Sequence, residues 1–396
     1  DTKTGISGRA GVTYIRAEQI YTIEEGDTLA GIAEQFGQKV IHLVRSNPYL
    51  LNETFLLPGR QIVIAYKDTE NREMDVFGYA YSFIKEAVLE ETLLYIDELL
   101  PFSYGYNEDG SLIAMNDDRL LSEANRFGRR KRMVITPLDR NERFNNQLVI
   151  CLLESSAVQD ILLANILNIM REKGYRALDI DFEFIPAPYR EAYVAFIQKT
   201  TKMLHDSGFE VSVAVPPKIA DDQPGLLYEG IDYEGIGRAA DTVFLMTYEW
   251  GYKYGPPMAV APVPNVRRVL DYAVSVIPND KIYMGIPNYA YDWPLPFERN
   301  VTEAETIGNV EAVRRAYQYR TEILYDETAM APYYYYTKEG IQHVVWFEDV
   351  RSIREKYNLV AEYGFRGAGY WNLMREFRAN WLYVAQITTN ALAQRK

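Results

Sequence analysis

Eight short apolar segments, most of them followed by a helical pattern, set the strongest limit on how this chain can fold. The strand-like segments lie at 75–83, 100–106, 132–137, 177–184, 210–216, 242–249, 281–290 and 367–372. The helical patterns between them include 89–99, 118–128, 155–173, 188–206 and 263–276. Strands that alternate with helices build a parallel sheet, and eight such units are typical of a (β/α)8 barrel. We therefore expect an α/β fold, a TIM barrel over residues 75–396.

One connection is too long for this alternation. Between Trp293 and Gly364, where one helix would suffice, a helical run at 309–320 is followed by strand-like segments at 323–327, 333–336 and 342–347. Antiparallel strands with a helix would make an inserted α+β subdomain, expected at about 299–363. A barrel loop of this length is usually functional and often forms one wall of a groove.

The N-terminal part has a different pattern. Residues 1–19 show no sustained period and are interpreted as a tail, while residues 67–74 are polar and are interpreted as a linker. Between them, residues 20–66 give strand, helix, helix and strand. In the first helix, apolar side chains recur at helical spacing and Gly37 ends the run. We therefore expect a separate βααβ module.

This module resembles the LysM domain. The resemblance is carried by the residues Tyr21-Thr-Ile-Glu-Glu-Gly-Asp-Thr-Leu29, Ile32-Ala33, Phe36-Gly37, Asn47-Pro48 and Leu57-Pro-Gly-Arg-Gln-Ile62. It implies binding of glycans that contain N-acetylglucosamine, such as peptidoglycan or chitin. The family's sugar groove corresponds here to Gly26, Asp27, Thr28, Leu29, Asn47, Pro48 and Tyr49. The alternative is that these residues only cap helices and form turns.

One strand-like segment carries three acids. Asp179, Asp181 and Glu183 alternate with Leu178, Ile180, Phe182 and Phe184. Because side chains on a strand alternate between faces, we expect the carboxyls to line one face and the apolar side chains to pack on the other. An exposed edge strand, a hard-metal site and a buried structural network are the alternatives to a catalytic array. The flanking helical patterns favour a central strand, and no glycine turn supports a calcium loop.

Composition narrows the classes of site. Cys151 is the only cysteine, and the three histidines, His42, His205 and His343, have no ligand spacing, so neither a zinc site nor a Cys–His nucleophile is expected. The net charge of −13 argues against nucleic acid as a partner. No apolar run reaches the length of a membrane span. The chain begins at Asp1 without the basic start and apolar stretch of a signal peptide, so we expect that any such peptide has been removed or never existed.

The acidic segment also carries a resemblance. Leu178-Asp-Ile-Asp-Phe-Glu183 is similar to the Asp-x-Asp-x-Glu strand of glycoside hydrolase family 18. Further similar segments are Met246-Thr-Tyr-Glu-Trp250, Gly285-Ile-Pro-Asn-Tyr-Ala-Tyr-Asp-Trp293, Val345-Trp-Phe-Glu-Asp349 and Gly369-Tyr-Trp-Asn-Leu373. With the LysM-like module in front, the arrangement resembles the spore-cortex-lytic N-acetylglucosaminidases of spore-forming bacteria.

The resemblance implies a role for each site residue. Glu183 would be the general acid and base, Asp181 would bind the acetamido N–H of the substrate, Asp179 would tune Asp181, and Tyr248 would bind the acetamido oxygen. Trp371 would be the apolar floor under the reacting sugar. Position at strand ends adds weaker candidates for substrate binding, which are Trp250, Glu249, Asn288, Tyr289, Asp292 and Trp293. Like-charged neighbours would keep Glu183 protonated by raising its pKa.

The expected function is that of a retaining, substrate-assisted hydrolase of β-linked N-acetylglucosamine in peptidoglycan, anchored by LysM. The alternatives are a chitinase and a non-catalytic glycan-binding protein. Neither a cofactor nor a metal is expected, and the partner is the glycan, not nucleic acid or a membrane. We expect a monomer located outside the cell, at the wall or the spore.

Overall fold

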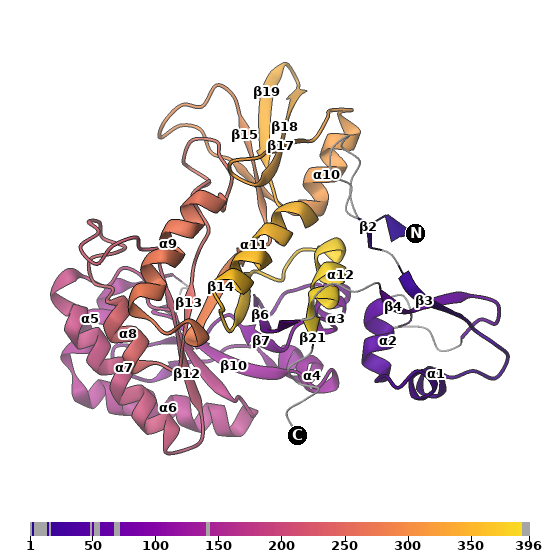
Figure 1. Ribbon diagram of the computed structural model, residues 1–396. Helices are drawn as coiled ribbons and strands as arrows, with labels where there is room; N and C mark the ends of the chain where they lie inside the picture. Colours follow the sequence, from indigo (N-terminus) through magenta and orange to yellow (C-terminus); the bar gives the residue numbers. More distant parts are fainter. Residues whose placement is uncertain are drawn as a thin grey trace.

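The centre of the molecule is a closed barrel of eight parallel strands (Figure 1). The computed structural model describes residues 2–3, 14–15, 17–47, 50, 56–66, 72–139 and 143–389. In spatial order the barrel strands are β6 (Asp75–Ala80), β7 (Glu98–Pro101), β10 (Arg130–Ile135), β11 (Ala177–Ile180), β12 (Glu210–Val215), β13 (Thr242–Leu245), β14 (Ile282–Pro287) and β20 (Gly367–Trp371). Each of the eight predicted segments supplies one of them. The predicted TIM barrel is confirmed.

Helices surround the barrel. They are α3 (Glu86–Leu93), α4 (Asp118–Arg126), α5 (Asn146–Glu154), α6 (Ser156–Lys173), α7 (Arg190–His205), α8 (Tyr233–Ala239), α9 (Val263–Val276), α11 (Val350–Glu362) and α12 (Arg378–Ile387). The helix predicted at 89–99 is wrong at its end, because α3 stops at Leu93 and β7 starts at Glu98. Residues 93–100 are largely apolar, and periodicity alone does not separate a buried helix end from a buried strand in such a run.

Short elements complete this part of the chain. They are the hairpin of β8 (Gly105–Tyr106) and β9 (Leu112–Ile113), the 3-10 turns Ala187–Tyr189 and Asn279–Lys281, and the parallel pair of β5 (Arg72–Glu73) with β21 (Thr388–Thr389). Within the described residues, no single helix is long and apolar enough to cross a membrane, although the bent pair α5 and α6 passes the same test by length and composition.

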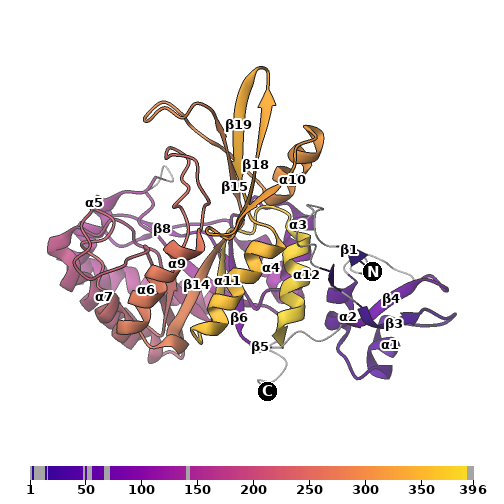
Figure 2. The same cartoon turned by 45° about the horizontal axis from the view of Figure 1, so that its top comes forward.

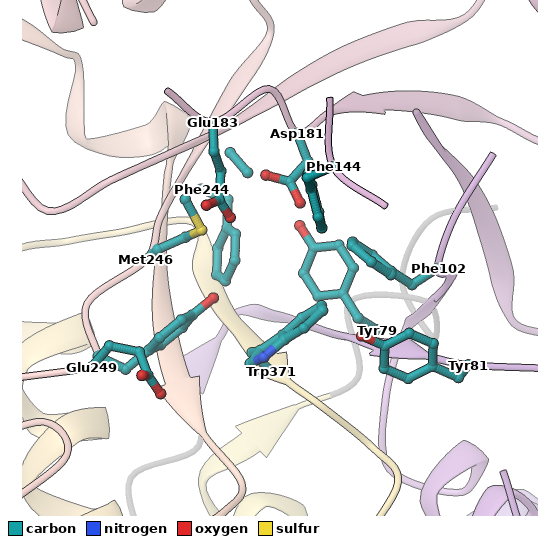
Figure 3. Close-up of a pocket in the computed structure, with 12 residues that line it drawn as sticks. Tyr79, Tyr81, Phe102, Phe144, Asp181, Glu183, Phe244, Met246, Glu249 and Trp371 are labelled. Atoms are coloured by element: carbon teal, nitrogen blue, oxygen red, sulfur yellow. The ribbon is translucent and has the colours of Figure 1, made fainter. Parts of the chain in front are cut away.

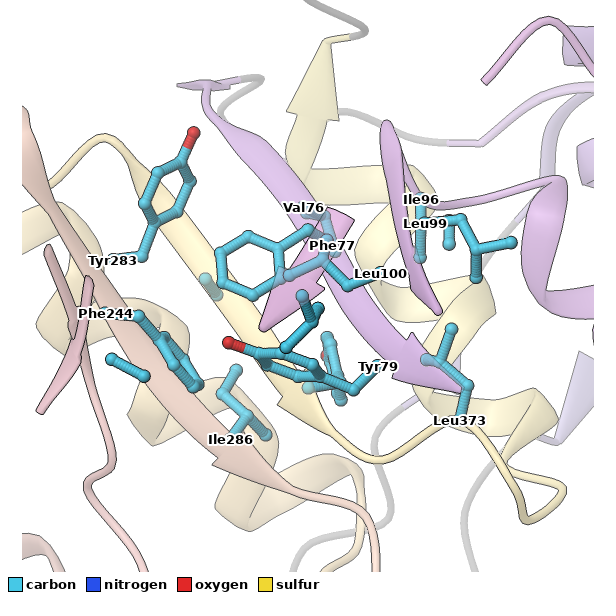
Figure 4. Close-up of a cluster of buried hydrophobic side chains, with 14 of the residues drawn as sticks. Val76, Phe77, Tyr79, Ile96, Leu99, Leu100, Phe244, Tyr283, Ile286 and Leu373 are labelled. Atoms are coloured by element: carbon cyan, nitrogen blue, oxygen red, sulfur yellow. The ribbon is translucent and has the colours of Figure 1, made fainter. Parts of the chain in front are cut away.

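Aromatic rings fill the barrel interior (Figure 4). The Phe77 ring meets Phe244 and Tyr283 edge-on, with ring centres 5.1 and 4.9 Å apart. Gly369 on the neighbouring strand makes this possible, since a Cβ there would lie 2.3 Å from the Phe77 ring. Tyr79 lies two residues after Phe77 on β6 and extends the aromatic packing toward the C-terminal end of the barrel.

The inserted subdomain is a five-stranded antiparallel sheet with one helix, and it stands above the barrel (Figure 2). Its elements are β15 (Ala290–Pro294), β16 (Glu305–Ile307), α10 (Asn309–Gln318), β17 (Leu324–Asp326), β18 (Ala331–Lys338) and β19 (Ile341–Trp346). The sheet starts at Ala290, earlier than the predicted boundary at about 299. The insertion also ends before the predicted boundary at about 363. Its last strand, β19, stops at Trp346, and the following helix α11 packs on the barrel strands β14 and β20 and so belongs to the barrel.

The N-terminal module consists of β3 (Ala17–Thr22), α1 (Leu29–Gln35), α2 (Val40–Ser46) and β4 (Gln61–Tyr66), with β3 and β4 antiparallel. The tail residues of β1 (Thr2–Lys3) and β2 (Tyr14–Ile15) pair with each other. The module lies against the barrel through α2. The Arg45 guanidinium donates a hydrogen bond to the Leu94 carbonyl, and the Tyr95 hydroxyl donates one of 2.9 Å to the Arg45 carbonyl.

Candidate active site

The acids Asp181 and Glu183 lie just after the C-terminal end of strand β11. The strand finishes at Ile180, and the Asp181 N–H still donates to the Ile135 carbonyl at 3.0 Å, which carries the pairing one residue further. The prediction of one strand through residue 184 is therefore wrong at its end. Nevertheless, the carboxyls of Asp181 and Glu183 line the same pocket.

This pocket lies at the C-terminal end of the barrel and has a volume of about 190 Å³. Figure 3 shows Asp181 and Glu183 entering from one side and Trp371 from the opposite side. The lining residues are Tyr79, Tyr81, Phe102, Phe144, Asp181, Glu183, Ala214, Phe244, Met246, Tyr248, Glu249 and Trp371. Aromatic rings make most of the wall, and the acids lie on it as a small polar area.

Asp179 lies deeper and does not line the pocket. Its carboxylate accepts hydrogen bonds from the Tyr79 hydroxyl at 2.8 Å and from the Ser212 hydroxyl. Burial raises the pKa of Asp179, while the nearby Arg132 guanidinium opposes that shift. This acid is satisfied by its neighbours, so it can act on a substrate only through Asp181.

Asp181 is the acid without a full set of partners. Its side chain is buried, and among the described residues its Oδ1 has no hydrogen-bond partner. Burial, and then the charges of Glu183 and Asp179, raise the pKa of Asp181 well above its ordinary value. A buried acceptor without a donor is costly. The site therefore has an acceptor ready for a donor that a ligand would supply.

Glu183 faces a second glutamate across the pocket. Burial, and then the charge of Glu249, raise the pKa of Glu183. The Glu249 backbone has a positive φ of 69°, and its carboxylate accepts hydrogen bonds from the hydroxyls of Tyr289 and Tyr291, the latter at 2.9 Å. The sequence predicts raised pKa values from like-charged neighbours on the same segment, and the charge of Glu183 does raise the pKa of Asp181. The charge of Glu249, on the loop after β13, also raises the pKa of Glu183, and the sequence did not predict that contribution.

Tyr248 and Trp371 complete the pocket. Tyr248 follows β13 and is only 7% exposed. The Trp371 ring ends strand β20 and meets Phe102 and Tyr79 edge-on, at 4.8 and 5.5 Å between ring centres. These contacts fix the indole as a flat apolar surface opposite the acids.

Three predicted substrate-binding residues lie elsewhere, and the prediction for them is wrong. Asn288 is buried and donates to the carbonyls of Asn372 and Arg375. Asp292 is buried in the insertion, where it accepts hydrogen bonds from the side chains of Arg315, Tyr336 and His343. The Trp293 ring is fully buried, and its Nε1 donates to the Gly255 carbonyl at 2.9 Å. None of the three has surface left for a sugar.

Two further predicted substrate-binding residues lie near the pocket without lining it. Trp250 is half-buried, packs against the core and does not line the pocket. Tyr289 reaches the pocket only through its hydrogen bond to Glu249. Conversely, the sequence analysis missed seven lining residues, which are Tyr79, Tyr81, Phe102, Phe144, Ala214, Phe244 and Met246. All of them except Phe144 lie at or next to the C-terminal ends of barrel strands, where active sites of this fold form, and that position could have identified them.

The predicted sugar-groove residues of the N-terminal module differ in their exposure and hydrogen bonds. Asp27 accepts hydrogen bonds from the Tyr21 hydroxyl and the Glu24 N–H, and Thr28 caps helix α1 by accepting from the Gly31 N–H. Gly26 and Thr28 are exposed, and Leu29 is half-buried. Asn47 is 2% exposed and bonds to the backbone of Leu43 and Val63, so its side chain is not free for sugar and that prediction is wrong. Pro48 and Tyr49 lie outside the described residues.

Comparison with known proteins agrees with this geometry. The family model described as "Glycosyl hydrolases family 18" matches residues 151–376, which is more than half of the chain. The chain belongs to glycosyl hydrolase family 18. The LysM domain model matches residues 21–65 of this family 18 chain. The molecule is therefore a glycosidase that carries a LysM domain, which confirms both resemblances.

Individual relatives show which members of the family this chain is similar to. The family 18 chain is 38% identical to the cortical fragment-lytic enzyme of Bacillus subtilis over 93% of its own length and 97% of that protein. It is 35% identical to the enzyme of the same name from Bacillus cereus, over 76% and 71% of the two chains. The crystal structure of the spore cortex-lytic enzyme SleL of Bacillus megaterium superposes with a TM-score of 0.78 at 36% identity and covers 93% of this chain and 86% of that one.

Proposed function

We propose that this glycosidase cleaves the β-linked N-acetylglucosamine bonds of peptidoglycan, in the cell wall or the spore cortex, with retention of configuration. The relatives named for the lysis of cortical fragments and of spore cortex support this substrate, and so does the LysM domain. The two parts of the chain then have different roles. The LysM module at 20–66 binds the glycan through Gly26, Asp27, Thr28 and Leu29. The barrel at 75–396 hydrolyses it.

The observation that carries the proposed mechanism is the unpartnered Oδ1 of Asp181 beside Glu183. An amide N–H of the substrate would satisfy this acceptor, and the 2-acetamido group of N-acetylglucosamine has one. Accepting that hydrogen bond turns the acetamido carbonyl toward the anomeric carbon of the same sugar. The substrate then brings its own nucleophile, which is the exception that this family makes to the two-carboxylate rule.

The reaction would proceed in two steps. Glu183 donates its proton to the glycosidic oxygen as the C–O bond breaks, while the acetamido oxygen bonds to the anomeric carbon and forms a cyclic oxazolinium ion. Water then attacks that carbon, gives its proton to Glu183 and reopens the ring. Asp181 balances the positive ring, Asp179 tunes the pKa of Asp181 through its charge, the Tyr248 hydroxyl binds the acetamido oxygen, and Trp371 supports the sugar face.

The raised pKa of Glu183 suits its role as the general acid. A general acid must hold its proton at the working pH, and burial with the charge of Glu249 raises the pKa of Glu183. The single chain, located at the wall or the spore, is proposed as the active unit.

The test is to incubate the protein with peptidoglycan fragments and with chitin oligomers side by side and to identify the new reducing ends. We expect new N-acetylglucosamine reducing ends from peptidoglycan, formed faster than from chitin at equal bond concentration. Faster cleavage of chitin would make the protein a chitinase. Turnover of neither substrate by folded protein would leave only glycan binding.

A further inference from the structure

The chain segment that carries the Trp371 indole leaves the barrel sheet at the pocket. Strand β14 ends at Pro287 and β20 ends at Trp371, and these two residues are the last register partners of the pair. Beyond them, one backbone bond remains on the β6 side, where the Leu373 N–H donates to the Tyr79 carbonyl at 2.8 Å. On the other side, the segment is held by the residue that follows β14.

This residue, Asn288, makes three hydrogen bonds to the segment. Its backbone N–H donates to the Trp371 carbonyl at 2.9 Å, and its Nδ2 donates to the carbonyls of Asn372 at 2.9 Å and Arg375 at 3.0 Å. The side chain is 0% exposed. A polar group is stable in such a place only when it is hydrogen-bonded. The contacts with residues 371–375 therefore account for an amide at this position.

The inserted subdomain sets the orientation of the Asn288 amide. The Glu348 backbone N–H donates to the Asn309 Oδ1 at 2.9 Å, which leaves the Asn309 Nδ2 facing the Asn288 Oδ1 at 3.4 Å. Glu348 in turn accepts a hydrogen bond of 2.8 Å from the Lys356 Nζ, and both side chains are 1% exposed. Because its Oδ1 meets a donor, the Asn288 amide presents its Nδ2 to the two carbonyls.

The position of residues 371–375 matters for the site because Trp371 lines the pocket. The indole packs edge-on against Phe102 and Tyr79, and it is half-buried. Its backbone therefore helps to decide where its flat face lies relative to the acids on the opposite side (Figure 3). A shift of about 1 Å in a group that holds the substrate can lower a rate by a factor on the order of 10².

We propose that Asn288 is a positioning residue for the glycosidase reaction, which holds residues 371–375 so that the Trp371 indole lies opposite Asp181 and Glu183. It acts through Trp371 and does not touch the substrate. The inference rests on the proposed role of Trp371 as the support of the reacting sugar. It also gives the inserted subdomain a part in the site, because Asn309 on α10 fixes the orientation of the Asn288 amide.

The experiment uses the full chain labelled with 5-fluorotryptophan, so that each of the five tryptophans gives a fluorine NMR signal. Trp371→Ala identifies the Trp371 signal by its loss. Asn288→Leu keeps nearly the same shape and removes both side-chain donors. Asn47→Leu is the matched control, because the Asn47 Nδ2 also donates to two backbone carbonyls, those of Leu43 and Val63 in the LysM module.

We expect Asn288→Leu to shift or broaden the Trp371 signal and to lower kcat/KM on soluble peptidoglycan fragments by about five- to tenfold. In the Trp371→Ala background, the same substitution should change kcat/KM by less than about twofold, because the effects of two residues that act through one another are not additive.

Two further variants separate positioning from general stability. Asn288→Asp should show an intermediate effect, because its carboxyl stays protonated between two carbonyl oxygens and donates one of the two hydrogen bonds. Asn47→Leu should lower Tm by a few degrees, as Asn288→Leu does, and should change neither the Trp371 signal nor kcat/KM.

Three results would overturn the proposal. They are an unchanged Trp371 signal in Asn288→Leu, an undiminished further loss of activity when Asn288→Leu is added to Trp371→Ala, and equal effects on signal and activity in Asn47→Leu. If Asn288→Leu does not fold, Asn288→Asp takes its place under the same criteria. If the wild type does not cleave the fragments, the proposed function fails, while the Trp371 signal still tests the role of Asn288.

Discussion

At the scale of single residues, the site is a set of carboxylates whose neighbours differ. Asp179 has two hydroxyl donors, Asp181 has no donor to Oδ1 among the residues that the structure describes, and Glu183 faces the charge of Glu249. Burial raises the pKa of all three acids of the array. Because the folded state then holds protons that the unfolded state has released, these acids destabilise the fold as pH rises above the ordinary range of carboxyl pKa values.

Replacement of the general acid is the first prediction. Glu183→Gln keeps the size of the side chain and removes its proton, so kcat on soluble peptidoglycan fragments should fall by a factor on the order of 10² or more while binding persists. The variant should also lose less stability than the wild type as pH rises from about 4.5 toward neutrality, because it has no raised pKa at this position. Near wild-type turnover would exclude Glu183 as the acid.

The second prediction concerns Glu249. Glu249→Gln removes the negative charge that helps to raise the pKa of Glu183, so that pKa should fall. Activity requires protonated Glu183, and the alkaline limb of the pH profile of kcat/KM should therefore move to lower pH, with activity retained at acid pH. Loss of activity at every pH would instead identify Glu249 as a second catalytic carboxylate.

At the scale of elements, the insertion is organised around one buried acid. Asp292 on β15 accepts hydrogen bonds from Tyr336 on β18 at 2.5 Å and from His343 on β19 at 2.8 Å, and it pairs with Arg315 on α10. It thus joins two strands and the helix to its own strand. The same strand carries Tyr291, which holds Glu249 at the pocket. The fold of the insertion therefore bears on the site.

The third prediction follows from this network. Asp292→Ala leaves the Tyr336 hydroxyl and the His343 ring without that acceptor, so the free energy of unfolding should fall by about 2–4 kcal/mol. Glu234→Ala, which removes an exposed partner of Arg238 on helix α8, is the matched control and should cost less than about 0.5 kcal/mol. Urea unfolding measures both variants. Similar losses in the two would show that Asp292 is not the centre of the insertion.

At the scale of the whole molecule, the LysM module is attached to the barrel by more than its chain connection. Arg45 on α2 is 5% exposed, and burial lowers its pKa to about 9. Its guanidinium and its carbonyl both bond to the segment between α3 and β7. Helix α12 of the barrel also packs against α2. The module is thus placed as a docked part of the molecule.

The fourth prediction separates docking from catalysis. A chain that starts at Arg72 should fold, because the barrel has its own core, with a Tm a few degrees lower since the α2 contacts are lost. It should cleave soluble fragments within about twofold of the intact rate and insoluble wall at least about tenfold more slowly, because the LysM module raises the local substrate concentration. Equal losses on both substrates would mean that the module shapes the active site.

The sequence by itself determined the features that depend on neighbours along the chain. The alternation of strands and helices is set by local apolar periodicity, and it was sufficient for the barrel and for the LysM module. The two-residue spacing of Asp179, Asp181 and Glu183 is set by backbone geometry, and it predicted a shared array of acids. Glycine and proline signals around 26–37 and 57–62 likewise act through local backbone conformation.

Only the tertiary structure decided what depends on segments far apart in the chain. Asn288 follows barrel strand β14, and Asp292 and Trp293 come soon after it on β15, yet partners from other segments bury all three. Glu249 meets Glu183 only because β13 and β11 close into one barrel. Phe184 is 41% exposed because strand β11 ends before it, and the alternation that predicted its packing no longer applies there. The physical reason is common to these cases: periodicity describes the direction of a side chain, and packing decides what it meets there.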